Sequence, residues 1–154
     1  MGYDFGVGRE APLFTLPAHD GSAVALSRYR GDWFPVLVFF DPATPGIDGY
    51  LRELSAAADE LWGYRGQLIA LAQADRDTLR ALADRAGSLS FPLVADEDAD
   101  VAKAYGAWDR DEGRVSPVAY IADRAHKLVW SGEGANGLPP RVAGLRAAFL
   151  EVVR

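Results

Sequence analysis

Residues 33–54 read WFPVLVFFDPATPGIDGYLREL, in which an apolar run, a short loop and an amphipathic segment follow one another. Val36 to Phe40 carries β-branched and aromatic side chains without a polar residue, which predicts a central strand covered on both faces. Apolar residues then recur at helical spacing and predict a helix over 45–63. Thr44 is expected to cap this helix, with Pro45 at its first position. Chemistry, if the chain performs any, is expected at the loop.

Strands and helices also alternate on either side of this stretch. An irregular arm over 1–12 is expected to precede the elements predicted from hydrophobic pattern and turn residues. These are strands over 14–16 and 24–26, a helical turn over 27–31, a strand over 67–72, a helix over 77–86, a strand over 91–94, a helix over 98–105, a polar loop over 106–116, a hairpin of 118–121 with 127–130, and a last helix over 142–152.

This order of elements, with a cis-proline expected at Ser116-Pro117 before the last hairpin, is that of the thioredoxin fold. The prediction is therefore an α/β protein with a central mixed β-sheet, helices on both of its faces and an N-terminal hairpin. The sequence shows no linker or repeat, so we expect a single domain over residues 1–154.

The net charge of −6 argues against a nucleic-acid partner or a membrane-binding basic patch, because both require clustered Lys and Arg. The first residues lack the basic and apolar regions of a signal peptide, and no uncharged apolar stretch reaches the length of a membrane span. These features predict a cytoplasmic protein.

The sequence contains no cysteine, which excludes disulfides, thiolate metal sites and thiol-based catalysis. His19 and His126 are the only histidines, and neither lies in a metal-binding pattern. We expect both to be turn residues, with His126 in a left-handed backbone conformation. No metal and no cofactor is predicted.

Four segments together resemble the peroxiredoxin family, the alkyl hydroperoxide reductase and thiol-specific antioxidant group. The resemblance covers nearly the whole chain. It is carried by GREAPLFTLPAHDG at 8–21, LSRYRGDW at 26–33, FPLVADEDADVAKAYGAW at 91–108 and AYIADRAHKL at 119–128. The resemblance implies the thioredoxin-like fold and, in active members, a thiolate that attacks peroxide beside a Pro, a Thr and a distant Arg.

The resemblance places Ile47 at the position of the nucleophilic cysteine, because TPGI at 44–47 is similar to TPGC in one subgroup. Pro42 lies closer to Thr44 than the family spacing allows. Pro117 falls where the family has its arginine, and Arg114 could replace it only if the backbone bends toward the loop. The candidate site is thus degenerate at Pro42, Thr44, Ile47, Arg114 and Pro117, with no catalytic residue.

Two further positions depart from the family pattern. Arg52 stands where some relatives carry a resolving cysteine, and Asp48 adds a carboxylate to the first turn of the helix. A carboxylate there suits the helix dipole but would oppose a neighbouring thiolate.

Three functions remain open. The first is a peroxiredoxin-like protein that has lost thiol peroxidase activity and acts by binding or regulation, with an unknown protein partner. The second is an antioxidant oxidoreductase with a metal or cofactor near Asp41, Asp48 and Tyr50. The third is a binding module that uses a sheet edge or the four tryptophans, although such residues more often lie in the core or at its rim. Family resemblance makes a homodimer plausible.

Overall fold

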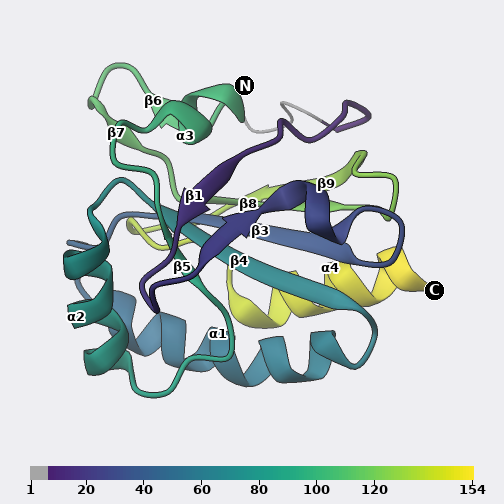
Figure 1. The fold of residues 1–154 in the computed structure, drawn as a ribbon, viewed down its shortest axis with the longest axis horizontal. Coiled ribbons are helices and arrows are strands. Elements are labelled where there is room, and N and C mark those ends of the chain that lie inside the picture. Colours follow the sequence, from purple (N-terminus) through teal and green to yellow (C-terminus); the bar gives the residue numbers. More distant parts are fainter. Residues whose placement is uncertain (1–6) are drawn as a thin grey trace.

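The computed structural model describes residues 7–154 and has a five-stranded mixed β-sheet at its centre (Figure 1). The strands lie in the order β5-β4-β3-β8-β9, and β3 runs parallel to β4 and antiparallel to β8. The sheet is mixed, as predicted. Its strands are β3 (Phe34–Phe40), β4 (Gly66–Ala72), β5 (Leu93–Ala95), β8 (Val118–Ala122) and β9 (Leu128–Glu133).

Three helices cover one face of the sheet: α1 (Ile47–Trp62), α2 (Arg76–Ala86) and α4 (Val142–Val153) (Figure 1). Side chains alternate along a strand, so Val36 and Phe40 of β3 point to this face and pack with Leu51 of α1 and Phe149 of α4. These residues belong to one buried apolar cluster, which fixes α1 beneath the middle of the sheet.

The opposite face is covered by shorter elements. Leu37 and Phe39 of β3 point to it and pack with Phe14, Leu26 and Tyr105. The covering elements are β1 (Thr15–Pro17), β2 (Ala23–Ala25), the 3₁₀ helix η1 (Leu26–Tyr29) and α3 (Asp100–Ala104). The N-terminal hairpin is β1 paired with β2, and helices lie on both faces, as predicted.

The predicted polar loop over 106–116 contains a small hairpin that the sequence did not reveal. It consists of β6 (Trp108–Asp109) and β7 (Arg114–Val115), which pair antiparallel. The Asp109 carboxylate accepts hydrogen bonds from the amides of Asp111 and Glu112 and closes the turn. Strands of two residues are too short to show an alternating pattern, which explains why the prediction was wrong.

Two local predictions near the loop after β3 are also wrong. Gly46, in a left-handed conformation with φ 85°, is the N-cap of α1, so the helix begins at Ile47 and neither Thr44 nor another side chain caps it. The left-handed conformation favours glycine, which lacks a Cβ, and it separates Thr44 from the first helical turn. The Ser116–Pro117 peptide is trans, and no cis peptide bond occurs among residues 7–154.

Candidate functional site

The loop between β3 and α1 is a tight turn held by its own first residue. The Asp41 carboxylate accepts a hydrogen bond from the Ala43 amide at 2.9 Å, and the Asp41 carbonyl accepts one from the Thr44 amide at 3.1 Å. The Thr44 carbonyl in turn accepts from the Ile47 amide at 3.1 Å. The amides of Ala43, Thr44 and Ile47 therefore already have hydrogen-bond acceptors within the turn.

Thr44, Arg114 and Pro117 line one cavity of about 400 Å³. Arg114 reaches this cavity from β7. Its guanidinium also lies 3.4 Å from the Glu112 carboxylate, and its side chain is 63% exposed. The structure thus brings three of the five predicted residues together. The other residues around the cavity are Asp41, Ala43, Pro45, Val115, Asn136 and Gly137.

The Thr44 hydroxyl is already engaged in a hydrogen bond and is not a free donor in the cavity. Its Oγ1 donates to the Gly137 carbonyl at 3.3 Å, across a separation of 93 residues in the chain. Gly137 has a φ of 79°, and a Cβ added there would lie 3.2 Å from the Thr44 Cγ2. Thr44 therefore fastens the loop after β3 to the segment before α4.

Ile47 does not line the cavity. Its side chain is 3% exposed and belongs to the cluster between the sheet and α1, with Phe40 and Leu51. Ile47, which the family resemblance aligns with the nucleophile, is thus a core residue. Pro42 also lies outside the Thr44 cavity and lines a smaller one of about 60 Å³ that Arg114 borders as well.

Arg52 has a structural role that the sequence did not indicate. Its Nε donates to the Ala86 carbonyl at 2.9 Å, and its Nη2 donates to the Arg85 carbonyl at 3.1 Å. These carbonyls belong to the last turn of α2, where a cation also complements the helix dipole. The Arg52 side chain therefore joins α1 to the end of α2.

Tyr50 is also engaged in a structural contact. Its hydroxyl donates to the Pro140 carbonyl at 2.6 Å, and burial, with a smaller effect of the nearby Glu53 carboxylate, raises its pKa. Tyr50 borders a second, larger cavity of about 710 Å³ between α1 and the segment before α4. No periodic pattern in the sequence predicts these contacts.

The candidate metal ligands do not form a site. Within residues 7–154, no three His, Asp or Glu side chains come together in a way that could hold a metal ion. His19 lies in the turn between β1 and β2, where its Nδ1 accepts from the Leu93 amide at 3.0 Å. His126 lies in the turn between β8 and β9 with a φ of 65°, as predicted.

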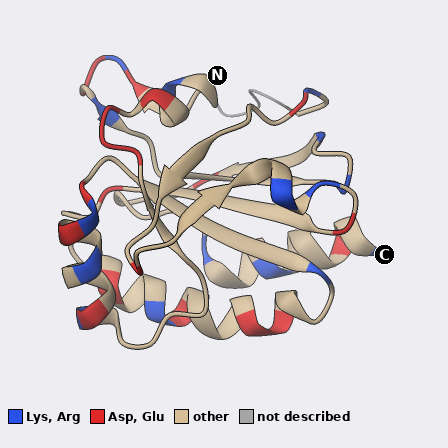
Figure 2. Cartoon of the chain, in the orientation of Figure 1, with Lys and Arg blue, Asp and Glu red and all other residues tan. Residues whose placement is uncertain are grey.

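The charged residues are mixed on the surface. Figure 2 shows acidic and basic residues interspersed along α1 and α2. Over the part of the chain that the structure describes, no helix is both long and apolar enough to cross a membrane. Trp108 and Trp130 are partly buried against the core, whereas Trp62 is 60% exposed, and its ring centroid is 5.6 Å from that of Trp33.

Comparison with known proteins agrees with this architecture. The model of the AhpC/TSA family matches residues 7–131. A putative peroxiredoxin of Mycobacterium tuberculosis is 34% identical over 103 residues, which cover 66% of this chain and 64% of that protein. The chain thus spans somewhat less than two thirds of that relative. The peroxiredoxin Bcp of Escherichia coli is 33% identical over 123 residues, covering 79% of this chain and 74% of that protein.

Solved structures show the same fold at lower identity. The peroxidoxin BcpB of Mycobacterium tuberculosis has a TM-score of 0.83 at 21% identity, covering 97% of this chain and 99% of that one. The mitochondrial 2-Cys peroxiredoxin of Plasmodium falciparum has a TM-score of 0.85 at 16% identity, covering 96% and 94%. These structures establish the thioredoxin-like fold that the sequence predicted. With its fold and family match taken together, the chain belongs to the AhpC/TSA family, of which it is a member without cysteine.

Proposed function

We propose that this protein has no thiol peroxidase activity and acts by binding, at the cavity between the β3–α1 loop and the segment before α4. The observation that carries the proposal is Ile47. The family resemblance aligns this residue with the nucleophile, its apolar side chain is buried in the core, and the sequence contains no cysteine. A saturated hydrocarbon side chain cannot attack peroxide, whereas the thiolate of an active relative can.

The polar groups that remain at the cavity favour binding over catalysis. Arg114 supplies a cation and Asn136 an amide, while the Thr44 hydroxyl is bound to the Gly137 carbonyl. A hydroxyl needs a nearby base to become a nucleophile, and both histidines lie in other parts of the fold. The cavity therefore offers recognition groups without an activated nucleophile.

The test is consumption of hydrogen peroxide by the metal-stripped protein in the presence of excess small-molecule thiol. We expect the wild-type rate to equal that of the thiol alone. An Ile47→Cys variant, measured in parallel, supplies the missing sulfur at the same place in the fold. Turnover by the wild-type protein would overturn the proposal, because a mechanism without a thiol would then have to operate.

An oxidoreductase with a metal or cofactor remains the alternative. No cluster of ligands within residues 7–154 favours it, and elemental analysis of protein purified without chelators tests it directly. A stoichiometric metal that is lost together with peroxide turnover would support this alternative.

A homodimer, an unknown protein partner and a cytoplasmic location also remain proposals. Sedimentation velocity over a range of protein concentrations tests the dimer. A single species at the monomer mass throughout that range would exclude it.

A further inference from the structure

The turn between β8 and β9 buries a histidine that the candidate site does not use. His126 is 1% exposed, and neither of its ring nitrogens has a hydrogen-bond partner among residues 7–154. Buried polar atoms are nearly always paired, because an unpaired one loses its hydrogen bonds to water without replacement. The ring nitrogens of His126 would gain hydrogen bonds in a conformation that exposes the imidazole to water.

The backbone around His126 holds a segment that we call the arm, residues 8–11. The Ala11 amide donates to the His126 carbonyl at 2.7 Å, and the Gly8 amide donates to the Leu128 carbonyl at 2.7 Å. The Leu128 amide donates back to the Arg9 carbonyl at 2.8 Å. The arm therefore pairs with residues 126–128, which end the turn and begin β9, on the edge that no other strand of the central sheet covers.

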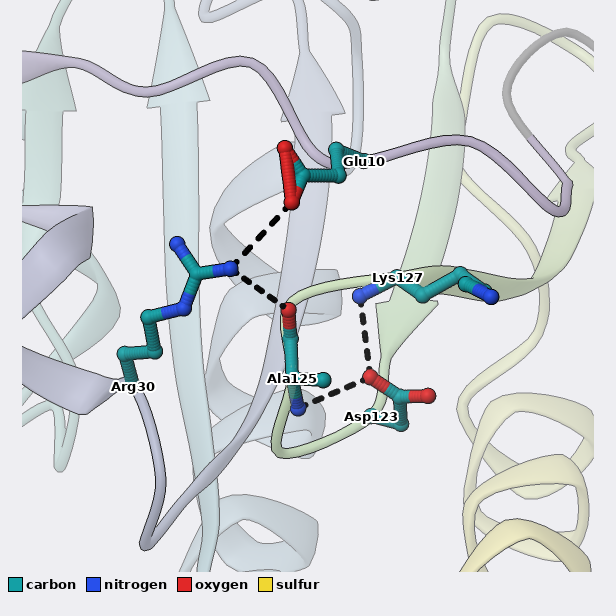
Figure 3. A network of polar contacts seen from close by, with 5 residues as sticks. All are labelled: Glu10, Arg30, Asp123, Ala125 and Lys127. Carbon is teal, nitrogen blue, oxygen red and sulfur yellow. Dashed lines mark hydrogen bonds and ion pairs between the residues drawn. The ribbon is translucent and has the colours of Figure 1, made fainter.

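A guanidinium joins the arm to the turn (Figure 3). One nitrogen of Arg30 lies 3.2 Å from the Glu10 carboxylate and 3.4 Å from the Ala125 carbonyl. The Asp123 carboxylate is engaged within the turn, where one oxygen accepts from the amides of Ala125 and Lys127, both at 2.9 Å. The positive charge of Arg30 thus already lies where the arm meets the turn.

The groups facing His126 disfavour its charged form on balance. Burial and the Arg30 guanidinium lower the pKa of the imidazole below its usual value of 6.5. The Tyr29 carbonyl faces the ring without making a hydrogen bond, and it opposes this shift together with the carboxylates of Asp123 and Glu10. A proton on His126 would therefore place a buried cation beside the guanidinium of Arg30, whose side chain is 50% exposed.

We propose that protonation of the His126 imidazole separates the arm from β9, and we call this response the latch. The arm is held by backbone hydrogen bonds of Gly8, Arg9 and Ala11, by the buried Ala11 side chain and by the Glu10–Arg30 ion pair, which is weak because the Glu10 side chain is 73% exposed. The turn is closed by more bonds, including Asp123 amide to Lys127 carbonyl and His126 amide to Asp123 carbonyl. Separation would free both backbone polar groups of Leu128 for another strand.

Amide hydrogen exchange of Gly8, Ala11 and Leu128 tests the latch. Each amide is compared with that of a His126→Asn variant at the same pH, so that the intrinsic pH dependence of exchange cancels. Asparagine tolerates the left-handed backbone at this position and does not titrate. Between about pH 7.5 and about pH 5, we expect wild-type protection to fall about tenfold more than that of the variant. The Leu71 amide in β4 should show no such difference.

A second measurement uses the wild-type protein alone and decides the matter if the variant does not fold. The NMR signal of the His126 ring is titrated over the same pH range. We expect its midpoint to lie below 6.5 and to coincide with the loss of arm protection. The proposal is overturned if the ring titrates while the arm stays protected, or if the arm loses protection equally in His126→Asn.

Discussion

Replacing Ile47 by alanine should lower the free energy of unfolding by about 3 kcal/mol. The change removes three carbons from a side chain that is 3% exposed. At about 0.8 kcal/mol for each buried methylene, the lost transfer free energy is about 2.4 kcal/mol. The cavity left behind lowers the free energy of unfolding further, and core substitutions of isoleucine by alanine lower it by about 2 to 5 kcal/mol in total. A small cavity cost added to the lost transfer free energy gives the expectation of about 3 kcal/mol, in the lower half of this range.

Urea denaturation followed by circular dichroism measures this change. With a slope of about 1–3 kcal/mol per molar urea, the midpoint should fall by about 1–3 M while the slope stays constant. The matched control is Leu13→Ala, which removes the same number of carbons from a side chain that is 61% exposed. If Ile47→Ala costs no more than Leu13→Ala, then position 47 is not a core position and the argument for a lost nucleophile replaced by packing is refuted.

Three further measurements test other parts of the structure. Tyr50→Phe should lower the free energy of unfolding by about 1–2 kcal/mol, seen as a lower midpoint in thermal unfolding, because the buried Pro140 carbonyl loses its donor. Gly137→Ala should cost about 1–2 kcal/mol by urea denaturation, since φ is 79° and the new Cβ meets the Thr44 methyl. Stability should fall as pH drops below about 6.5, because His126 has a lowered pKa and the unfolded chain binds the extra proton.

Each of these measurements has a matched control. Tyr64→Phe alters a tyrosine that is 51% exposed and should change stability by less than about 0.5 kcal/mol. Gly144→Ala places a Cβ in open space on a helix and should raise stability by about 0.5–1 kcal/mol. His126→Asn should remove a pH dependence equivalent to at most one proton. The reasoning fails if Tyr64→Phe destabilises as much as Tyr50→Phe, if Gly144→Ala destabilises as much as Gly137→Ala, or if His126→Asn keeps the wild-type pH dependence.

Most of the fold was predictable because its central strands are covered on both faces. β3 and β4 therefore appear in the sequence as continuous apolar runs, and α1 and α2 as segments with one apolar face. The β6–β7 hairpin was missed because its strands have two residues each and its turn is closed by the Asp109 side chain. Such a structure depends on one local hydrogen-bond acceptor and leaves no periodic signal.

The candidate site was predictable only in part. The family resemblance assigned Thr44 and Pro117 to the candidate site, and Arg114 only if the backbone bends toward the loop; in the structure all three line one cavity. The sequence wrongly predicted Thr44 as the cap of α1, because Gly46, in a left-handed conformation, is the N-cap and the helix starts at Ile47. The contacts of Tyr50 and Arg52 join residues 90 and 34 positions apart, so they follow from the packed fold and not from local sequence.

The long-range contacts of Thr44 and Tyr50 have a consequence for the order in which the protein assembles. Both side chains bond to carbonyls in the segment before α4, across 93 and 90 residues. The walls of the two cavities, one bordered by Thr44 and the other by Tyr50, are therefore incomplete until this late segment docks, even after β3, α1 and β4 have formed. On the ribosome, the first half of the chain would emerge with an open site, and ligand recognition would arise only as synthesis ends.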